Sequence, residues 1–335
     1  MGLTVAVTGP TGEVGTSFVA ALEREAGVDR VLGMARRPFD PAARGWRKTV
    51  YRRGDVLDRS AVDDLVAEAD VVVHLAFLIM GSHAETSRVN LAGARTVFGA
   101  TVTAPRPTRL VYASSVAAYG YHADNPVPLT EDVPTRGSSE HYYSRQKAES
   151  EAVLREVTDG SGLDVYVLRP CIVAGPGATV LADSMPWNQA GRLVSAAVRA
   201  GAGITPLLRP VLPDPGVPLQ LVHPDDVASA GVAAVLGRGS PGAYNIAGAG
   251  EVSLGEVARA LGGRGIRVPH AAAVAASTVV ARSPWSPAFV EWVHVARSSV
   301  VMDTRRARRE LGWRPRFTSS QALAALADAV AARRG

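Results

Sequence analysis

The first half of the chain alternates short apolar runs with segments in which apolar residues recur every three or four positions. The apolar runs are rich in β-branched residues, which predicts buried strands at residues 4–7, 31–34, 71–75, 109–113 and 165–168. The helical spacing predicts helices at residues 13–25, 61–67, 87–100 and 144–157. Because strands and helices alternate, we expect an α/β fold, a doubly wound parallel sheet of the Rossmann type.

The second half of the chain has a different pattern. Glycine and proline become dense after residue 170, which predicts a smaller, loop-rich C-terminal part. Its regular elements are predicted as strands at 219–222 and 243–246 and helices at 254–261 and 320–332. Ser319 and Ser320 stand at the start of the last helix, where serine hydroxyls commonly cap the first turn.

Composition narrows the class of protein. The 335 residues are 47% hydrophobic and 20% charged, which excludes a disordered chain. The longest uncharged apolar stretch, residues 271–281, is shorter than the roughly 20 residues that cross a bilayer, so we expect no membrane partner. The first strand begins so early that no secretory signal is expected to precede it. Cys171 is the single cysteine and can form no internal disulfide, so we expect the protein to be cytoplasmic. We expect Cys171 itself to be a packing residue.

The net charge of +5 is carried almost wholly by arginine, because Lys48 and Lys147 are the only lysines. The arginines are scattered among acids rather than gathered into one basic arm, so we expect no nucleic-acid partner. His74 and His223 have no further ligand at metal-binding spacing. We therefore expect no metal, and we expect both histidines to bond with the backbone.

A glycine-rich turn, residues 8–15, lies between the first predicted strand and the first predicted helix. The diphosphate of a dinucleotide needs a close approach of the backbone, a helix N-terminus directed at it, and tight packing of helix on strand. Three glycines spaced along this turn meet those needs, although an ordinary tight turn remains the alternative. The candidate cofactor-binding residues here are Gly9, Thr11, Gly12, Glu13, Val14 and Gly15.

The second predicted strand ends in arginines rather than in an acid. Proteins that bind NAD usually place a carboxylate there to accept from the ribose hydroxyls. Arg36 and Arg37 would instead bind a 2′-phosphate, so NADP is the preferred cofactor and NAD remains possible. Further along, Asp55 either accepts from the adenine amino group or closes a turn.

Domain organisation follows from these two halves. We expect a dinucleotide-binding domain over residues 1–172, to which segments near 219–248 return. Residues 173–335 are expected to form mainly the substrate-binding part.

Tyr143 and Lys147 stand four residues apart near the start of a predicted helix, so they share one face of it. A cation beside a phenol lowers the phenol's pKa from about 10 towards the working pH. Tyr143 is therefore a candidate acid for a carbonyl oxygen or base for an alcohol, with Lys147 as its partner. A purely structural contact between neighbouring turns is the alternative.

Two serines follow the predicted strand 109–113. The C-terminal ends of parallel strands line the ligand crevice of a doubly wound sheet, so a hydroxyl there can donate to the reacting oxygen. Ser115 is our candidate, Ser114 is the second choice, and a serine that only caps a turn is the alternative.

The sequence resembles the extended short-chain dehydrogenase/reductase family, also known as the NAD-dependent epimerase/dehydratase family. The resemblance rests on the glycine turn, the serine segment, the Tyr143–Lys147 pair and several shorter landmarks along most of the chain. It implies that Lys147 also holds the nicotinamide ribose and that two helices starting near residues 87 and 143 could form a homodimer. The residues it places around the cofactor are Val56, Leu75, Ala76, Asn90, Pro170 and Ile172.

Departures from the family pattern narrow the reaction. Where sugar dehydratases of the family carry an Asp-Glu pair, this chain has Val116 and Ala117, which disfavours dehydration. Ile172 and Leu219 occupy positions where sugar-nucleotide epimerases usually place an asparagine and an arginine. Residues 77–80 add apolar side chains near the expected cleft, with core packing as an equal explanation.

The sequence therefore predicts an NAD(P)(H)-dependent oxidoreductase that interconverts a carbonyl and an alcohol on a small, largely apolar metabolite, with Tyr143 as the acid/base. The alternative is a nucleotide-sugar epimerase that uses retained NAD. A protein that binds the dinucleotide without turnover is a third hypothesis.

Overall fold

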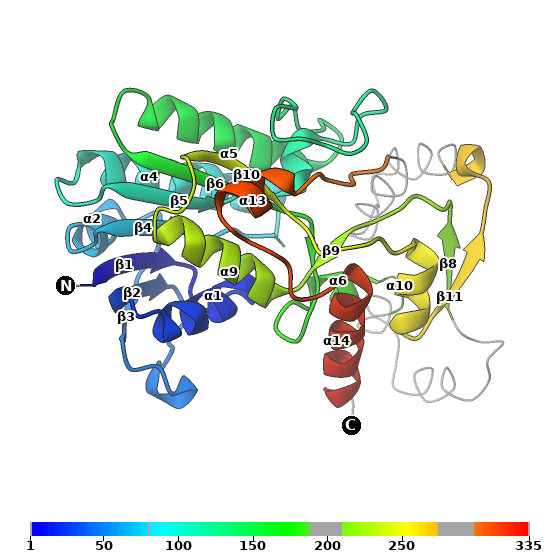
Figure 1. Ribbon diagram of the computed structural model, residues 1–335, viewed down its shortest axis with the longest axis horizontal. Helices are drawn as coiled ribbons and strands as arrows, with labels where there is room; N and C mark the ends of the chain where they lie inside the picture. The colour runs from blue at the N-terminus through cyan, green and yellow to red at the C-terminus, as the bar shows by residue number, and fades with distance from the viewer. Residues whose placement is uncertain (1, 80, 186, 188–209, 274–297, 334–335) are drawn as a thin grey trace.

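The computed structural model describes residues 2–79, 81–185, 187, 210–273 and 298–333. A seven-stranded parallel sheet is its centre, in the order β10-β6-β5-β4-β1-β2-β3 (Figure 1). Its strands are β1 (Leu3–Thr8), β2 (Val28–Ala35), β3 (Thr49–Arg53), β4 (Val71–His74), β5 (Arg109–Ala113), β6 (Asp164–Pro170) and β10 (Gly242–Ile246). The strand order reverses between β1 and β4, where such sheets form their ligand crevice. The predicted doubly wound fold is confirmed.

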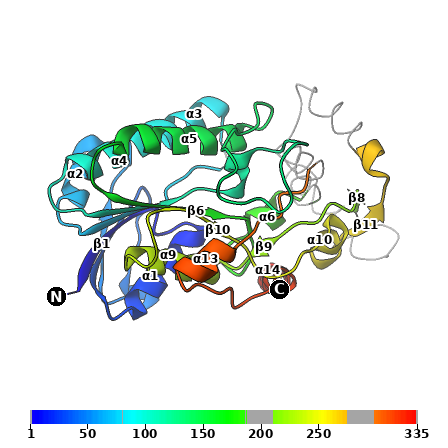
Figure 2. The ribbon, with the colours of Figure 1, turned by 45° about the horizontal axis from the view of Figure 1, so that its top comes forward.

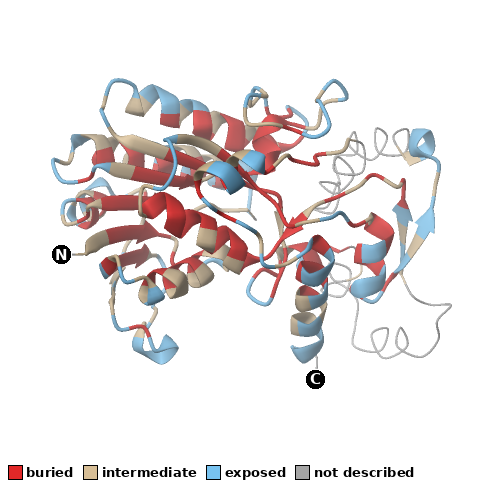
Figure 3. Cartoon of the chain, in the orientation of Figure 1, coloured by how far each residue is buried: buried red, intermediate tan, exposed pale blue. Residues whose placement is uncertain are grey.

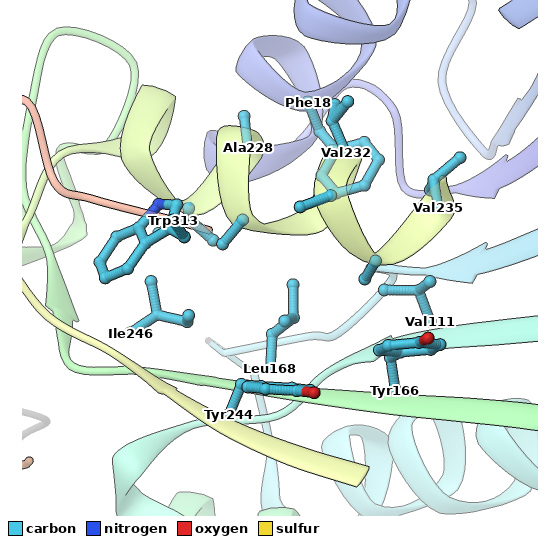
Figure 4. Packing of buried hydrophobic residues seen from close by; sticks show 14 of the residues in the cluster. Phe18, Val111, Tyr166, Leu168, Ala228, Val232, Val235, Tyr244, Ile246 and Trp313 are labelled. Atoms are coloured by element: carbon cyan, nitrogen blue, oxygen red, sulfur yellow. The ribbon is translucent and has the colours of Figure 1, made fainter. Parts of the chain in front are cut away.

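Helices cover both faces of this sheet (Figure 2). On one face lie α1 (Glu13–Arg24) and α9 (Pro224–Val235), and on the other α2 (Arg59–Val66), α4 (Gly93–Thr103) and α5 (Tyr142–Thr158). Strand side chains alternate between the two cores, as Val5 and Ala6 do on β1. Phe18 on α1 packs beside Val232 on α9 (Figure 4). A Cβ on Gly231 would lie 2.0 Å from the Phe18 ring, so the glycine at this position lets α1 and α9 approach closely.

The helix predicted at 87–100 is built from three pieces. They are α3 (His83–Ser87), a π-helical segment (Arg88–Ala92) and α4. Ser82 caps the first piece by accepting from the amide of Glu85 at 3.2 Å, so the helix begins earlier than its apolar spacing indicated. Widened turns of the π type often occur at functional sites, and this one carries Asn90. Short 3₁₀ turns lie at η1 (Ala42–Arg44) and η3 (Val116–Tyr119).

The C-terminal part extends from one end of the sheet and has its own apolar core (Figure 3). Two small parallel pairs belong to it, β7 (Ile172–Val173) with β9 (Leu221–Val222) and β8 (Val211–Asp214) with β11 (Arg264–Arg267). Its helices are α6 (Val180–Asp183), α10 (Leu254–Ala260), α13 (Arg305–Glu310) and α14 (Ser319–Ala332). Residues 224–246 return to the main sheet as α9 and the edge strand β10. The domain boundary at 172 stays a prediction.

The capping prediction for the last helix was wrong. Thr318 is the cap, accepting from the amide of Gln321 at 3.2 Å, because the Ser319 hydroxyl is buried and donates to Leu221 and Gly250 instead. The sequence patterns also missed β3 and α9. Met80 and the part of the 271–281 stretch from residue 274 lie outside the described residues. Within those residues, every helix is too short or too polar to cross a membrane.

Candidate functional site at the C-terminal edge of the sheet

Two of the three glycines in the turn after β1 are required by the packing of the protein itself. Gly9 has a φ of +77°, and a Cβ there would lie 2.8 Å from the amide nitrogen of Ala76. A Cβ on Gly15 would lie 2.1 Å from the carbonyl oxygen of Gly9. Gly12 differs, because a Cβ there would meet only the Gly9 oxygen at 3.4 Å, and its φ of −77° suits any residue. The open space at Gly12 is what a closely approaching diphosphate needs.

Gly12 is also the N-cap of α1 and offers no side-chain cap to the first turn. The amides of that turn are therefore available to an anion, and the helix dipole favours negative charge there. Glu13 begins the helix, but its carboxylate accepts from the amide of Val180 at 2.8 Å. Burial raises the pKa of this carboxyl. The Glu13 side chain thus joins the glycine turn to α6, and the contact of Glu13 with a cofactor stays a prediction.

The strands on either side of the order reversal are joined at their ends. The Thr8 hydroxyl lies 2.7 Å from Nδ1 of His74, and the amide of Leu75 donates to the Thr8 carbonyl at 3.1 Å. Burial, aided by the positive charge of Lys147, lowers the pKa of His74 to about 3, so the imidazole is neutral. The expected backbone partner is found for His223, which accepts from the Asp225 amide at 3.2 Å, but His74 bonds to a side chain.

Arg36 and Arg37 follow β2 and are exposed. Their carbonyl oxygens accept from Arg53 and from the Tyr51 hydroxyl, while neither guanidinium has an acidic partner in the described part of the chain. Asp55, after β3, accepts from the amide of Leu57 at 3.1 Å, so one of its oxygens closes a turn, as the alternative interpretation expected. The next residue, Val56, is buried against α4, where a Cβ on Gly93 would lie 2.6 Å from it.

Lys147 and Tyr143 lie one turn apart on α5, on the face that meets the ends of β4 and β5. The Lys147 side chain is nearly inaccessible, with a relative exposure of 3%, and its Nζ donates to the carbonyl of Ala113 at 2.8 Å. Burial lowers the pKa of Lys147 to about 7, against the opposing effect of the Glu151 carboxylate. Nζ is 5.9 Å from the centre of the Tyr143 ring. The phenyl ring of Phe77 contacts both residues, 3.7 Å from Nζ and edge-on to the Tyr143 ring at 5.5 Å.

The structure distinguishes the two serines after β5. Ser114 donates its hydroxyl proton to the Glu151 carboxylate at 2.5 Å, so that proton is already committed. Ser115 accepts from the amide of Ala117 at 3.2 Å, which caps η3 and leaves its own proton to be donated elsewhere. Ser115 is thus both a turn cap and the better candidate donor to a reacting oxygen.

A buried polar network that the sequence patterns did not predict connects α5 to β6, η3 and β10. Glu151 and Arg169 form a two-pronged ion pair with distances of 3.0 and 2.7 Å. Arg169 also donates to the Tyr119 hydroxyl at 2.9 Å, and that hydroxyl donates to Asn245 on β10 at 2.7 Å. Buried charges persist when they are paired in this way. The spacing of four residues between Lys147 and Glu151 is the sequence signal that could have found the carboxylate.

Asn90 holds the segment after β4 against α5. Its amide oxygen accepts from the Leu78 amide at 2.7 Å, and its nitrogen donates to the Leu78 carbonyl at 3.0 Å and to Gln146 at 2.8 Å. Pro170 is the last residue of β6 in the main sheet, and Ile172 is the first residue of β7, which pairs with β9 in a separate small sheet. Cys171 between them is buried, which raises the pKa of its thiol and fits the expected packing role.

Other features of the described residues lie apart from this edge. A hollow of about 380 Å³ lies between α1, α9 and residues 311–316. A second, of about 390 Å³, lies along residues 124–136. Neither is lined by a predicted site residue. The described residues contain no group of three or more histidine, cysteine or acidic side chains placed to hold a metal ion. The candidate site is therefore the strand edge from the glycine turn to the Tyr143–Lys147 pair.

A parallel sheet with a glycine turn at its order reversal defines a Rossmann-type α/β protein. The chain belongs to the NAD dependent epimerase/dehydratase family, whose model matches residues 5–247. The resemblance seen in the sequence and the prediction of an enzyme of this family are both confirmed.

Individual relatives are distant. The protein y4nG of Sinorhizobium fredii is 27% identical over 96% of this chain and 76% of its own length. A ceramide reductase of Caulobacter vibrioides is 32% identical over 52% of this chain and 48% of its own. Among solved structures, dTDP-glucose 4,6-dehydratase of Bacillus anthracis in complex with NAD has a TM-score of 0.71, with 18% identity over 98% of this chain and 97% of that one.

Proposed function

We propose that the protein is an NAD(P)(H)-dependent oxidoreductase that interconverts a carbonyl and an alcohol on a small, largely apolar metabolite. The observation that carries this proposal is the pairing of Tyr143 with Lys147, whose Nζ bonds to Ala113, two residues before Ser115. The Ser115 hydroxyl donates to no partner among the described residues. When bound, the nicotinamide cofactor supplies or accepts the hydride. The protein's own residues hold the substrate oxygen and move its proton.

Each of the three residues has a distinct role in this proposal. Tyr143 gives a proton to the carbonyl oxygen in reduction and takes one from the hydroxyl in oxidation. Ser115 donates a hydrogen bond to the same oxygen and so stabilises the negative charge that develops there. The ammonium group of Lys147 lowers the pKa of the Tyr143 phenol. Because the pKa of Lys147 is about 7, this electrostatic help weakens as the pH rises through neutrality.

The residues around the glycine turn fit a dinucleotide. The space at Gly12 and the uncapped amides of α1 suit the diphosphate, and the related dehydratase is described in complex with NAD. Arg36 and Arg37 are exposed and have no acidic partner among the described residues, which supports the finer proposal that NADP is preferred. The remaining cofactor contacts proposed are Leu75, Ala76 and Asn90 after β4, Asp55 and Val56 after β3, Pro170 at the end of β6 and Ile172 at the start of β7.

An apolar substrate is supported by the side chains near the pair and by one relative. Phe77 borders both Tyr143 and Lys147. Leu219 and Ile172 stand where a sugar-nucleotide enzyme of the family would carry polar side chains, as the sequence resemblance implied. One relative, matched over about half of each chain, is named a ceramide reductase, which supports reduction of a carbonyl.

The test is a Tyr143→Phe variant assayed with NADPH and NADH against a panel of ketones and aldehydes. Loss of the general acid lowers turnover by about 10²–10⁴-fold, while dinucleotide affinity changes little. Tyr166→Phe is the matched control, because the Tyr166 hydroxyl donates to the Gly239 carbonyl at 2.9 Å, at the end of the sheet where β10 begins. Turnover by Tyr143→Phe above about a tenth of the wild-type value would overturn the acid/base role.

One further observation would change the proposed reaction. NAD that stays bound through purification, together with interconversion of a nucleotide sugar without net oxidation, would support the epimerase alternative instead.

The expected homodimer pairs α4 and α5 with their copies, and these helices lie side by side (Figure 2), with an exposed Arg95–Glu156 ion pair at 2.9 Å. Light scattering of the purified protein measures its oligomeric state.

A further inference from the structure

The ring of Phe77 occupies a specific place at the candidate site. Phe77 follows β4 directly after Leu75 and Ala76, the segment that abuts the glycine turn at Gly9. Its ring face lies over the Lys147 ammonium at 3.7 Å. The same ring meets the Tyr143 ring nearly perpendicularly, at 81°. One apolar side chain therefore contacts both members of the proposed catalytic pair.

The surroundings of Lys147 show what this ring does. Nζ donates one proton to Ala113, and it faces the ring of Tyr112 on β5 at 5.3 Å. The titratable and charged groups around it are Tyr143 and Glu151 on α5, His74 on β4 and Tyr112 on β5, while Arg169 and Ser114 hold Glu151. An ammonium group has three protons to satisfy, and here an aromatic face covers it where water would otherwise bond.

The backbone on the C-terminal side of Phe77 is held firmly. Asn90 bonds to both the amide and the carbonyl of Leu78, and Tyr142 donates to the carbonyl of Ile79. The peptide groups of Leu75 and Ala76 are packed against Gly9. With the chain fixed on both sides, the phenyl ring leaves Lys147 by rotating its side chain, and the segment itself stays in place.

We propose that Phe77 is a positioning residue whose ring covers the Lys147 ammonium, keeps water from the Tyr143–Lys147 pair, and turns away from Lys147 when a dinucleotide binds there. This inference rests on the proposed function and on the contact between Lys147 and the cofactor ribose that the family resemblance implies. It assigns to Phe77 a role in cofactor binding and in the protonation of Lys147. Simple core packing also predicts a change in the Lys147 pKa, but it predicts no gain in dinucleotide affinity when the ring is removed.

The first measurement is the titration of Lys147 in the ligand-free protein. Labelling the Cε position of lysine with carbon-13 yields two resonances, one for each lysine, and that of Lys48 is the internal reference. In Phe77→Ala, water reaches the ammonium, so the pKa of Lys147 rises from about 7 towards its ordinary 10.5, by about one unit or more. In Phe77→Leu, the apolar bulk remains and the ring's attraction for the cation is lost, so the pKa does not rise. An unchanged midpoint in Phe77→Ala overturns the inference.

The second measurement is the affinity for NAD and NADP by calorimetry. Phe77→Ala binds the preferred dinucleotide at least about fivefold more tightly than wild type, because no ring has to leave the ammonium first. If the wild-type protein binds neither dinucleotide, the proposed function itself fails. If wild type binds one and Phe77→Ala binds it no more tightly, the proposed function stands and this inference alone fails.

Discussion

Replacement of Lys147 by methionine tests the electrostatics of the site without any substrate. The unfolded chain holds a proton on this lysine up to about pH 10.5, whereas burial lowers the pKa in the folded protein to about 7. Between these values the unfolded state binds more protons, so the wild-type protein becomes more stable as the pH rises. The cost of burying the amine is fully present below pH 7 and disappears above 10.5. Methionine has a similar length and carries no such cost.

The magnitude follows from the size of the pKa shift. Each pKa unit corresponds to about 1.4 kcal/mol, so the burial cost is about 4 kcal/mol at pH 7.5 and about 1.5 kcal/mol at pH 9.5. The stability difference between Lys147→Met and wild type therefore falls by about 2.5 kcal/mol over this range. Loss of the bond to Ala113 and of the contact with Phe77 lowers the stability of the variant by an amount that changes little with pH.

The assay is urea unfolding of both proteins at several pH values between 7.5 and 9.5, analysed as the difference in the free energy of unfolding. Other groups that titrate in this range cancel in the difference, since both proteins contain them. Lys48→Met is the matched control, because it removes the other lysine, whose Nζ donates to the Glu25 carbonyl at 2.7 Å. A difference that stays constant across this pH range would show that Lys147 keeps its charge when folded and would refute the reasoning.

Other expectations follow from single contacts. Gly12→Ala leaves thermal stability nearly unchanged but weakens dinucleotide binding by about tenfold or more. Gly15→Ala lowers the free energy of unfolding by about 1–3 kcal/mol, because the added Cβ meets backbone atoms. Melting curves measure the stability of both variants, and calorimetry measures their affinity for the dinucleotide. Replacing Arg36 and Arg37 by serine lowers affinity for NADP about tenfold and leaves affinity for NAD almost unchanged, and equal losses would contradict a 2′-phosphate site. Glu151→Gln leaves a buried guanidinium unpaired and lowers the free energy of unfolding by about 3–5 kcal/mol, measured in urea; a loss below 1 kcal/mol would contradict the buried ion pair.

Local patterns determined the parts of this protein that depend on near neighbours in the chain. The alternation of apolar strands and helical segments predicted the doubly wound sheet, because side-chain periodicity is a property of a few consecutive residues. The strand-glycine-helix order placed the turn, and the four-residue spacing placed Tyr143 and Lys147 on one face of α5. β3 escaped notice because its pattern, Thr49–Arg53, is short and largely polar.

Only the tertiary structure decided the features that join distant parts of the chain. Tyr119 meets Asn245 across 126 residues, and Glu13 meets Val180 across 167, and neither pairing leaves a local sequence signal. The choice between Ser114 and Ser115 depends on which hydroxyl reaches the Glu151 carboxylate, a contact made between β5 and α5. Hydrogen bonding and burial depend on distances in the folded chain, so sequence spacing could name the candidates at this site but could not assign their protons.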